Sequence, residues 1–384
     1  MNIALVTNGI APFVLGGMQQ HSISLGIELV KSGHKVDLFH FVHKNQKILS
    51  KNEINYFFFN KNYGFENVFC TYFPSSIKFP GHYIWNSIKY SKWVYNIIIR
   101  DENKYDFIYS KGFSSWEILK NKKEINCKSK IGIKFHGYEM FQYSPNLKIK
   151  LQNIMFRPFV KYINRNADYI FSYGGKISEI IKKLGVPNDK IIEIPSAIDS
   201  SWVKDKIKTT KKVIKFLYVG RYERRKGINE IYKSVLELSK NQNNLEFHFL
   251  GPIPNHKKIN ISNIKIKYYG LIKNDLRKQE IYDSCDVLIC PSYSEGMPNV
   301  ILEAMSRGLA IISSDVGAIS KLVCSENGIL INKINSNSIK CAIKNITNDK
   351  NLLNQMKYSS IRKVQEQFLW TNISKLINSE LNYF

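Results

Sequence analysis

Short apolar runs alternate with longer stretches of helical spacing along most of the chain. The first run covers residues 3–7, a helical stretch follows at 18–31, and a second run covers 36–42. Ser32-Gly33 closes the helical stretch in the way that helices commonly end. A strand, a helix and a strand in this order predict a βαβ unit. Later strands of the same parallel sheet are expected at 106–110, 130–135 and 169–172.

The pattern breaks near residues 195–210 and then starts again. A polar run at 204–212 has the composition of a linker. A second series of strands is expected beyond it, at 214–219, 245–250, 264–269, 287–289 and 310–313. The chain is therefore predicted to be an α/β protein with two Rossmann-like domains, whose parallel sheets face each other across a cleft.

The predicted N-terminal domain covers residues 1–200, and the predicted C-terminal domain covers 201–365. The tail from about residue 351 has helical spacing, and segment 366–384 is expected to cross back and pack on the first domain. The stretch 45–93 is rich in aromatic residues and poorly periodic, so the pattern predicts no element there.

Positive charge dominates, with 56 Lys and Arg against 31 Asp and Glu and a net charge of +25. The excess is spread over both halves and forms no basic tail. A solvated Lys-rich surface, nucleic acid, an anionic membrane and phosphorylated small molecules are all compatible with it. No nucleic-acid-binding module is recognisable, so no nucleic-acid partner is expected. Among the functional partners, the membrane surface is favoured.

The N-terminal segment lacks a positive region and a long apolar run, so we expect no signal peptide. No stretch approaches the ~18 apolar residues of a membrane span. A cytoplasmic protein is predicted, at most peripheral on the inner face of the membrane. The cysteines form no Cys-x-x-Cys pair and no His/Cys cluster, so we expect reduced structural thiols and no metal. They are Cys70, Cys127, Cys285, Cys290, Cys324 and Cys341.

Two motifs in the second half carry candidate chemistry. The first follows the strand at 214–219, where Gly220 and Arg221 lead through a basic loop to Lys226. Open α/β sheets bind ligands at the carboxyl ends of their strands. There Arg221 offers phosphate oxygens a two-pronged donor, and Lys226 offers a point charge. A solvated basic loop is the alternative interpretation.

The second motif surrounds a predicted helix start. Pro298 suits a first helical turn, because its missing N–H costs nothing there. Glu295 precedes this helix and Glu303 lies inside it. Helix N-termini bind anions through free N–H groups, and a carboxylate can accept two vicinal hydroxyls. The segment expected to form the anion site is Gly296, Met297, Pro298, Asn299 and Val300.

Together these motifs resemble glycosyltransferase family 4, the "glycosyl transferases group 1", whose fold is GT-B. The family's Glu-x7-Glu motif is matched by Glu295 and Glu303. Its Val-Gly-Arg…Lys-Gly run is matched from Val219 to Gly227. Its Gly-Gly loop and His-Gly pair are matched by Gly16-Gly17 and His136-Gly137. The second half matches nearly throughout, and the first half matches at these landmarks.

The resemblance implies a role for each site residue. Arg221 and Lys226 would neutralise the donor diphosphate beside Gly220. Glu303 would bind the ribose hydroxyls, and Glu295 would contact the donor sugar near the reacting centre. His136 would face the anomeric carbon as the second catalytic residue. Gly16 and Gly17 would let the backbone approach the phosphates.

The implied function is retaining, metal-independent transfer of a sugar from a UDP- or GDP-sugar to a glycan or lipid-linked acceptor. Bacterial surface polysaccharide assembly is the implied setting. No cofactor is expected, and no Asp-x-Asp metal motif is present. A sugar-nucleotide epimerase or other GT-B enzyme is one alternative. A non-enzymatic binder of acidic polymers is another.

The sequence also departs from the family pattern. The linker motif Pro-Asn-Gly-x-Asp appears here as Pro195-Ser196-Ala197-Ile198-Asp199. The later run Asp-x-Gly-Gly-x-x-Glu begins at Asp315 and ends in Lys321 instead of the acid. These changes spare the expected diphosphate and ribose contacts, but they prevent the donor sugar from being inferred from other members.

Overall fold

The structure is a computed structural model that describes residues 1–14, 16–60, 63–74, 81–101, 104–122, 128–207, 209–210, 213–240 and 244–383. Cys127 and three residues of the predicted linker, Lys208, Lys211 and Lys212, lie outside these ranges, as does Phe384 of the predicted crossing segment. Within the described ranges, no helix is both long enough and apolar enough to cross a membrane.

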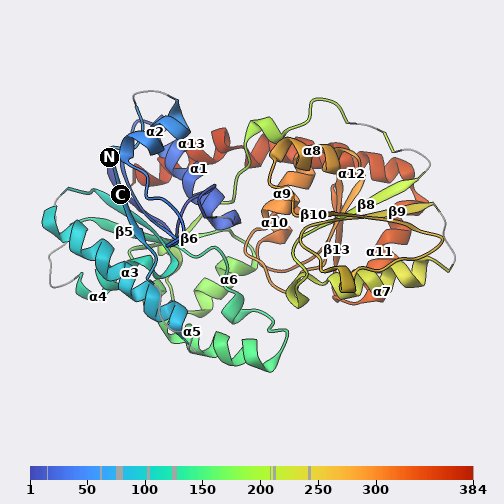
Figure 1. Cartoon of the computed structure of the whole chain (residues 1–384), viewed down its shortest axis with the longest axis horizontal. Helices are drawn as coiled ribbons and strands as arrows, with labels where there is room; N and C mark the ends of the chain where they lie inside the picture. The colour runs from blue at the N-terminus through green and yellow to red at the C-terminus, as the bar shows by residue number, and fades with distance from the viewer. Residues whose placement is uncertain are drawn as a thin grey trace. The chain divides into compact units, whose positions relative to one another are not determined.

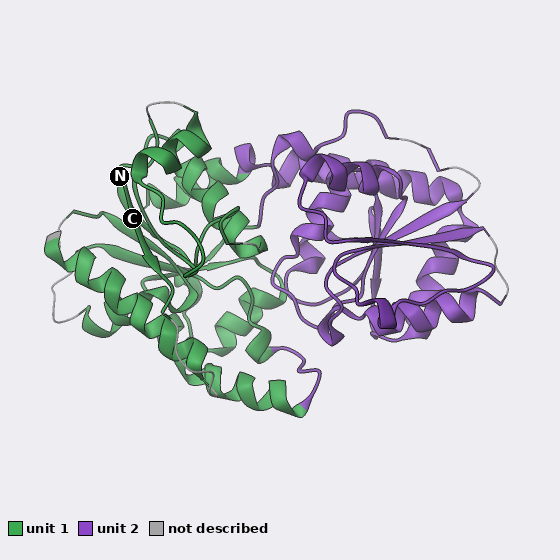
Figure 2. Cartoon of the chain, in the orientation of Figure 1, with its two compact units in different colours: residues 1–141, 147–195, 373–384 green, residues 142–146, 196–372 purple. Residues whose placement is uncertain are grey.

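The chain forms two compact units (Figures 1 and 2). Unit 1 comprises Met1–Phe141, Leu147–Pro195 and Ile373–Phe384, and unit 2 comprises Gln142–Asn146 and Ser196–Asn372. The boundary between these segments of the two units thus falls after Pro195, whereas the predicted domain boundary follows residue 200. The C-terminal segment joins unit 1 from Ile373 onward, and His34 Nε2 lies 3.0 Å from Asn378 Oδ1.

Unit 1 is built on a seven-stranded sheet in the order β3-β2-β1-β4-β5-β6-β7, and all its pairings are parallel. Ile3 at its centre is opposite both Val36 and Phe107, and all three are fully buried. The strands are β1 Asn2–Val6, β2 Lys35–Val42, β3 Asn67–Tyr72, β4 Phe107–Lys111, β5 Lys130–Lys134, β6 Tyr169–Ser172 and β7 Ile191–Glu193.

Seven α-helices of the described chain accompany this sheet. They are α1 Gly17–Lys31, α2 Lys51–Phe59, α3 His82–Ile98, α4 Trp116–Asn121, α5 Leu147–Asn166, α6 Lys176–Lys183 and the C-terminal α13 Trp370–Leu381. Helix α2 begins with a capping box, in which Ser50 and Glu53 each accept from the other's backbone N–H. This local signal lies in the stretch for which the pattern predicted no element.

Unit 2 is built on a six-stranded parallel sheet in the order β10-β9-β8-β11-β12-β13. Its strands are β8 Ile214–Val219, β9 Leu245–Leu250, β10 Lys265–Gly270, β11 Val287–Cys290, β12 Ala310–Ser314 and β13 Gly328–Ile331. Its helices are α7 Ile228–Leu238, α8 Asp275–Asp283, α9 Asn299–Ser306, α10 Ile319–Leu322, α11 Ser336–Asn348 and α12 Lys350–Lys363. Phe216, Phe247 and Ile343 are among the residues of its hydrophobic core.

Counted from their own first strands, both sheets have the Rossmann order 3-2-1-4-5-6, which unit 1 extends by β7. The predicted α/β class with parallel sheets is therefore confirmed. Each predicted strand is observed, and both of its ends lie within two residues of the predicted ones. The pattern missed α2, β3 and α3 in the aromatic-rich stretch, and it also missed the short strands β7 and β13.

Candidate active site

The candidate donor site lies at the topological switch point of unit 2. Strands β8 and β11 are neighbours there, although β9 and β10 lie between them in sequence. Their carboxyl ends lead directly into the two motifs that the sequence singled out, after Val219 and after Cys290. A crevice outside the carboxyl ends at such a point is where open α/β sheets bind ligands.

Glycine fixes the path of the loop after β8. Gly227 has a φ of +69°, and a Cβ at this position would lie 2.2 Å from the carbonyl oxygen of Pro291. Only glycine fits this backbone without strain or collision. The backbone N–H of Tyr293 donates to the carbonyl of Arg225 at 2.8 Å. The basic loop is thereby held against the segment that carries Glu295.

Glu295 is the centre of a buried charge cluster in unit 2. Only 7% of the residue is exposed. Lys226 Nζ lies 2.6 Å from Oε1 of Glu295, and Arg225 NH1 lies 3.4 Å from Oε2. Burial raises the pKa of this carboxyl, but the charges of Lys226 and Arg225 outweigh burial and hold it below the ordinary value. Glu295 is therefore an ionised partner of both cations.

Arg221 has a different environment from Lys226. Its side chain is 69% exposed, and its Nε lies 3.0 Å from Oε1 of Glu223. The structure thus places Lys226 with Glu295 and leaves Arg221 at the solvent-facing side of the loop. Arg225 takes the second cationic position beside Glu295, which sequence reasoning missed. The signal was present in the consecutive cations Arg224, Arg225 and Lys226.

The N-terminus of α9 carries unused hydrogen-bond donors. Pro298 is the N-cap in extended conformation, so the helix begins at Asn299, just after the predicted position. Among the described residues, none accepts from the backbone N–H groups of Gly296, Met297, Asn299 or Val300. Together with the helix dipole, these groups can bind an anion.

Neighbouring segments hold this N-terminus in place. Gly317 has a φ of +60°, and a Cβ there would lie 2.3 Å from the carbonyl oxygens of Glu295 and Gly296. Ser196, from the altered linker motif, donates through its backbone N–H to the sulfur of Met297 at 3.0 Å. Its hydroxyl bonds Oδ1 of Asn299 at 3.1 Å. Ser196, which stands where the family motif has Asn, therefore contacts the start of α9.

Glu303 lies inside α9, about one turn after its first residue, Asn299. Its Oε2 accepts a hydrogen bond of 2.6 Å from the hydroxyl of Tyr282. Burial raises the pKa of the Glu303 carboxyl, and the Tyr282 hydrogen bond opposes that shift only in part. No described residue bonds Oε1 of Glu303, so this oxygen is available to hydroxyl groups of a ligand. Tyr282 was not anticipated from the sequence.

Unit 1 carries a second cluster at the corresponding switch point, where β1 and β4 are neighbours. His136 follows β5 by two residues, and its Nδ1 lies 2.8 Å from the hydroxyl of Tyr173. The ring of His21 meets the His136 ring edge-on at a centroid distance of 5.5 Å. Gly16 is the N-cap of α1, and the His136 side chain forms a hydrogen bond with the backbone of Gly17. Gly16, Gly17 and His136 thus belong to one neighbourhood.

Two buried lysines lie behind this histidine. Lys111 ends β4 and is fully buried, with its Nζ 3.2 Å from Nδ1 of His21. Lys134 ends β5, donates to the carbonyl of Ile194 at 2.8 Å, and lies 4.0 Å from the ring centroid of Tyr173. In the described chain, no carboxylate pairs with either lysine. No local pattern in the sequence predicts that these two lysines are buried.

Burial and like charge shift the proton equilibria of this cluster. Burial lowers the pKa of Lys111 to about 7. Burial, followed by the charges of Lys111 and Lys134, lowers the pKa of His136 well below its ordinary value. His136 is therefore neutral near pH 7. A neutral imidazole that accepts from Tyr173 at Nδ1 carries its proton on Nε2.

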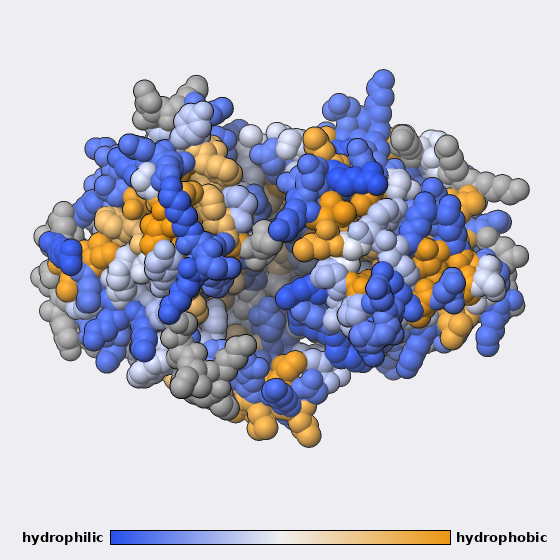
Figure 3. Space-filling view, in the orientation of Figure 1, coloured by the Kyte–Doolittle hydropathy of each residue, from blue (hydrophilic) through white to orange (hydrophobic). Residues whose placement is uncertain are grey.

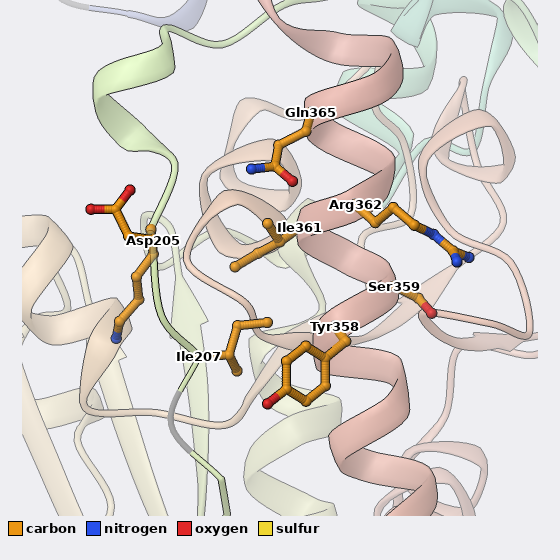
Figure 4. Close-up of a pocket in the computed structure, with 8 residues that line it drawn as sticks. Asp205, Ile207, Tyr358, Ser359, Ile361, Arg362 and Gln365 are labelled. Atoms are coloured by element: carbon orange, nitrogen blue, oxygen red, sulfur yellow. The ribbon is translucent and has the colours of Figure 1, made fainter.

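A cavity of about 330 Å³ elsewhere in unit 2 does not contain these residues. It lies between α12 and the segment around Ile207, and Figure 4 shows Tyr358 and Arg362 among its lining side chains. Arg362 contacts Glu326 at 3.4 Å. Among the described residues, no group of three His, Cys, Asp or Glu side chains could hold a metal ion.

Two family descriptions together match residues 15–363 of the chain. Residues 15–202 match "Glycosyltransferase Family 4", and residues 201–363 match "Glycosyl transferases group 1". The chain belongs to the group 1 glycosyltransferases. The family suggested by the Glu-x7-Glu and His-Gly motifs is thus confirmed.

Relatives of this glycosyltransferase differ in how much of it they match. An uncharacterized glycosyltransferase of Methanocaldococcus jannaschii is 23% identical over 98% of this chain and 96% of its own. The N,N'-diacetylbacillosaminyl-diphospho-undecaprenol alpha-1,3-N-acetylgalactosaminyltransferase of Campylobacter jejuni is 25% identical over 50% of this chain and 52% of its own. The UDP-Gal:alpha-D-GlcNAc-diphosphoundecaprenol alpha-1,3-galactosyltransferase of Escherichia coli is 36% identical over 28% of this chain and 26% of its own.

Solved structures support the fold of this glycosyltransferase. Sucrose-phosphate synthase from Thermosynechococcus elongatus has a TM-score of 0.79 at 18% identity, over 100% of this chain and 98% of that one. Anabaena HepE, solved with UDP and glucose, has a TM-score of 0.68 at 15% identity, over the full length of both chains. The chain therefore has the GT-B fold, as predicted.

Proposed function

We propose that this glycosyltransferase takes a sugar from a UDP- or GDP-sugar and transfers it, with retention of anomeric configuration and without a metal ion, to a glycan or lipid-linked acceptor. The observation that carries the proposal is the set of unused N–H groups from Gly296 to Val300 beside Lys226. Such a helix start suits the diphosphate of the donor, which becomes the leaving group.

Each residue of unit 2 has a role in this proposal. Lys226 and Arg225, with the α9 N-terminus, meet the charge that develops on the departing diphosphate. Arg221 approaches the same phosphates once it leaves Glu223. Glu303 accepts the ribose hydroxyls through the oxygen that Tyr282 does not use. Because these groups supply positive charge themselves, the reaction does not need a divalent cation.

Glu295 and His136 act on the donor sugar in the same proposal. Glu295 is held by two cations, so it remains an ionised hydrogen-bond acceptor for sugar hydroxyls. His136 is neutral with its proton on Nε2, so it can donate one hydrogen bond near the anomeric carbon without adding positive charge. Gly16 and Gly17 allow the α1 N-terminus to approach the donor phosphates.

The acceptor and setting are inferred from relatives. The E. coli and C. jejuni relatives bear names of enzymes that act on diphosphoundecaprenol-linked sugars. HepE was solved with UDP and with UDP-glucose. A lipid-linked acceptor in bacterial surface polysaccharide assembly, on the inner face of the cytoplasmic membrane, fits these names and the net charge of +25.

Product stereochemistry tests the proposal most fully. Purified protein is incubated with UDP- and GDP-sugars and a lipid extract, with and without EDTA, and the anomeric configuration of the product is read by NMR. Retention in the presence of EDTA supports the proposal. Inversion, or activity that EDTA abolishes, contradicts it. Recovery of an epimerised nucleotide sugar would favour the epimerase alternative instead.

A further inference from the structure

Helix α5 (Leu147–Asn166) of unit 1 has two apolar faces. Its inner face packs on the unit, where Val160 and Ile163 are fully buried and Phe159 lies 5.3 Å from the ring of Trp116. A helix that covers a domain in this way usually turns a polar face outward. The outer face of α5 does not follow this rule.

The outward face carries large apolar side chains at helical spacing. Leu147 is 77% exposed and Leu151 is 65% exposed. Ile154 and Met155 follow at 46% and 43%. Positions i, i+4, i+7 and i+8 lie on one side of a helix, so these four side chains form a continuous exposed stripe. Figure 3 shows apolar side chains gathered over α5 in the lower part of the view.

Cations border this stripe, and acids are absent from the helix. At 100° per residue, Lys148 lies along one edge of the stripe, and Lys150, Arg157 and Lys161 lie along the other. All four are exposed. The sequence of α5 contains no Asp or Glu. Long basic side chains at the edge of an apolar face can lay their stems on it while their charges reach phosphate groups.

The start of helix α3 (His82–Ile98) continues this surface. Gly81, its N-cap, is close to Met155, because a Cβ there would lie 3.3 Å from the Met155 methyl group. Trp85 is 52% exposed, and Lys89 Nζ lies 5.4 Å from the centroid of its ring. Helix α3 also contains no acidic residue. Tryptophan beside lysine is typical of segments at a membrane–water interface.

We propose that this α5 face, with Trp85 and Lys89 of α3, docks on an anionic lipid bilayer. An apolar stripe between cations is the pattern of a helix that lies in the interface without spanning it. The cations beside the apolar stripe favour an anionic bilayer as the partner, because such a bilayer supplies both an apolar layer and phosphate charge. The proposal deepens the proposed function, since a lipid-linked acceptor lies at such a surface, but docking can be measured without any transfer.

Co-sedimentation of the full chain with vesicles tests this proposal. The vesicles are either phosphatidylcholine alone or an equal mixture of phosphatidylcholine and phosphatidylglycerol. We expect binding to the mixed vesicles that weakens as salt is raised, and little binding to phosphatidylcholine. The double variant Leu147→Ser/Leu151→Ser should lower the partition coefficient at least about tenfold. Lys150→Ser/Lys161→Ser should lower it about tenfold on mixed vesicles only.

Matched substitutions on unit 2 serve as controls. Leu236→Ser/Leu276→Ser removes two leucines that are 57% and 71% exposed, and Lys233→Ser/Lys344→Ser removes two exposed lysines. Both control proteins should bind vesicles like the wild type. Equal losses in the controls, or unchanged binding in the α5 variants, would overturn the proposal.

Two further readouts separate this proposal from its competitors. Gel filtration that shows a wild-type dimer and a monomeric leucine variant would assign the face to a second copy of the chain and overturn the proposal. Stabilisation by nucleoside diphosphates is measured on every variant. Wild-type protein that binds nucleotide but not vesicles would overturn the docking proposal and leave the proposed glycosyltransferase site unaffected. Vesicle binding that is lost in the α5 variants, without any nucleotide binding, would support docking and count against the proposed function.

Discussion

The two units place opposite electrostatics at the same point of the same strand order. In unit 2, Lys226 and Arg225 lie against the carboxylate of Glu295. In unit 1, Lys111 and Lys134 are buried more deeply, and no described carboxylate pairs with them. One switch point thus holds compensated charge. The other holds two lysines whose pKa burial lowers, and their positive charge, where present, disfavours protonation of the neighbouring imidazoles.

The two clusters suit different tasks. A compensated cluster can exchange one anion for another, so a diphosphate can approach the cations of unit 2 without a large cost in burying charge. A buried cation without a carboxylate costs stability, but it keeps a nearby imidazole neutral. In this account unit 2 binds the leaving group, and unit 1 presents His136 in one protonation state.

The largest predicted effect is the loss of Lys226. Lys226→Ala removes a cation from the site of the leaving group and leaves Glu295 with one fewer partner. We expect kcat/KM to fall about 10²–10³-fold, as when one preorganised donor is removed from an active site. Steady-state kinetics on the donor measures it, with Lys233→Ala on α7 as the control. Near-wild-type activity would refute the role of this cluster.

Removal of the imidazole of His136 tests the role proposed for unit 1. His136→Ala should lower kcat about 10²-fold and leave the affinity for the nucleoside diphosphate nearly unchanged, because the proposal assigns no diphosphate contact to His136. Titration calorimetry with UDP and GDP separates the two effects. A loss of nucleotide affinity equal to the loss of rate would contradict this division of roles.

Replacement of Lys111 measures the cost of the unpaired charge. The pKa of Lys111 in the folded protein, about 7, lies below its value of 10.5 in the unfolded chain. The unfolded state therefore binds more protons between about pH 7 and about pH 10, and Lys111 makes stability rise with pH in that window. Lys111→Met should raise the free energy of unfolding by about 2 kcal/mol at neutral pH and flatten this rise.

Urea unfolding at several pH values checks this prediction. Lys130→Met, at the exposed first residue of β5, is the control, and its stability should stay within about 0.5 kcal/mol of wild type. A destabilised Lys111→Met protein would mean that the lysine contributes more through its contact with His21 than it costs through burial.

The smallest effect concerns Tyr173. Tyr173→Phe keeps the ring over which Lys134 lies and removes the hydroxyl that meets His136 Nδ1. We expect kcat to fall about threefold to tenfold, roughly the worth of one hydrogen bond. The ¹⁵N chemical shifts of His136 should show a mixture of tautomers in the variant. An unchanged tautomer would remove Tyr173 as a positioning residue.

Sequence patterns predicted unit 2 better than unit 1. The strands of unit 2 are short apolar runs with clear breaks. Gly227, Glu295 and Glu303 belong to local motifs, in which the backbone of a turn or a helix start requires a given residue at a given position. In unit 1 the aromatic-rich stretch concealed α2, β3 and α3. A lysine at the end of a strand is usually expected to be solvated. The burial of Lys111 and Lys134 follows from packing between β4, β5 and β6, so the sequence pattern could not predict it.

Long-range partners were also beyond the sequence pattern. Tyr282 meets Glu303, and Tyr173 meets His136, across separations that no local spacing encodes. The prediction chose Arg221 and not Arg225, because the family motif specifies the position of an arginine but not which arginine lies beside Glu295. Buried charges and their partners depend on tertiary contacts, whereas glycines and helix starts carry local signals.

Thermal stabilisation by nucleotides shows whether the donor binds at the switch point of unit 2. The wild type and Glu303→Ala are melted with UDP, GDP, other nucleoside diphosphates and their sugar conjugates, each with and without EDTA. At 100 times its Kd the correct nucleotide should add about 2.7 kcal/mol of stability, which EDTA leaves unchanged and Glu303→Ala removes. A shift that needs a divalent cation, a shift that Glu303→Ala retains, or no shift with any nucleotide would contradict a donor site at the switch point of unit 2.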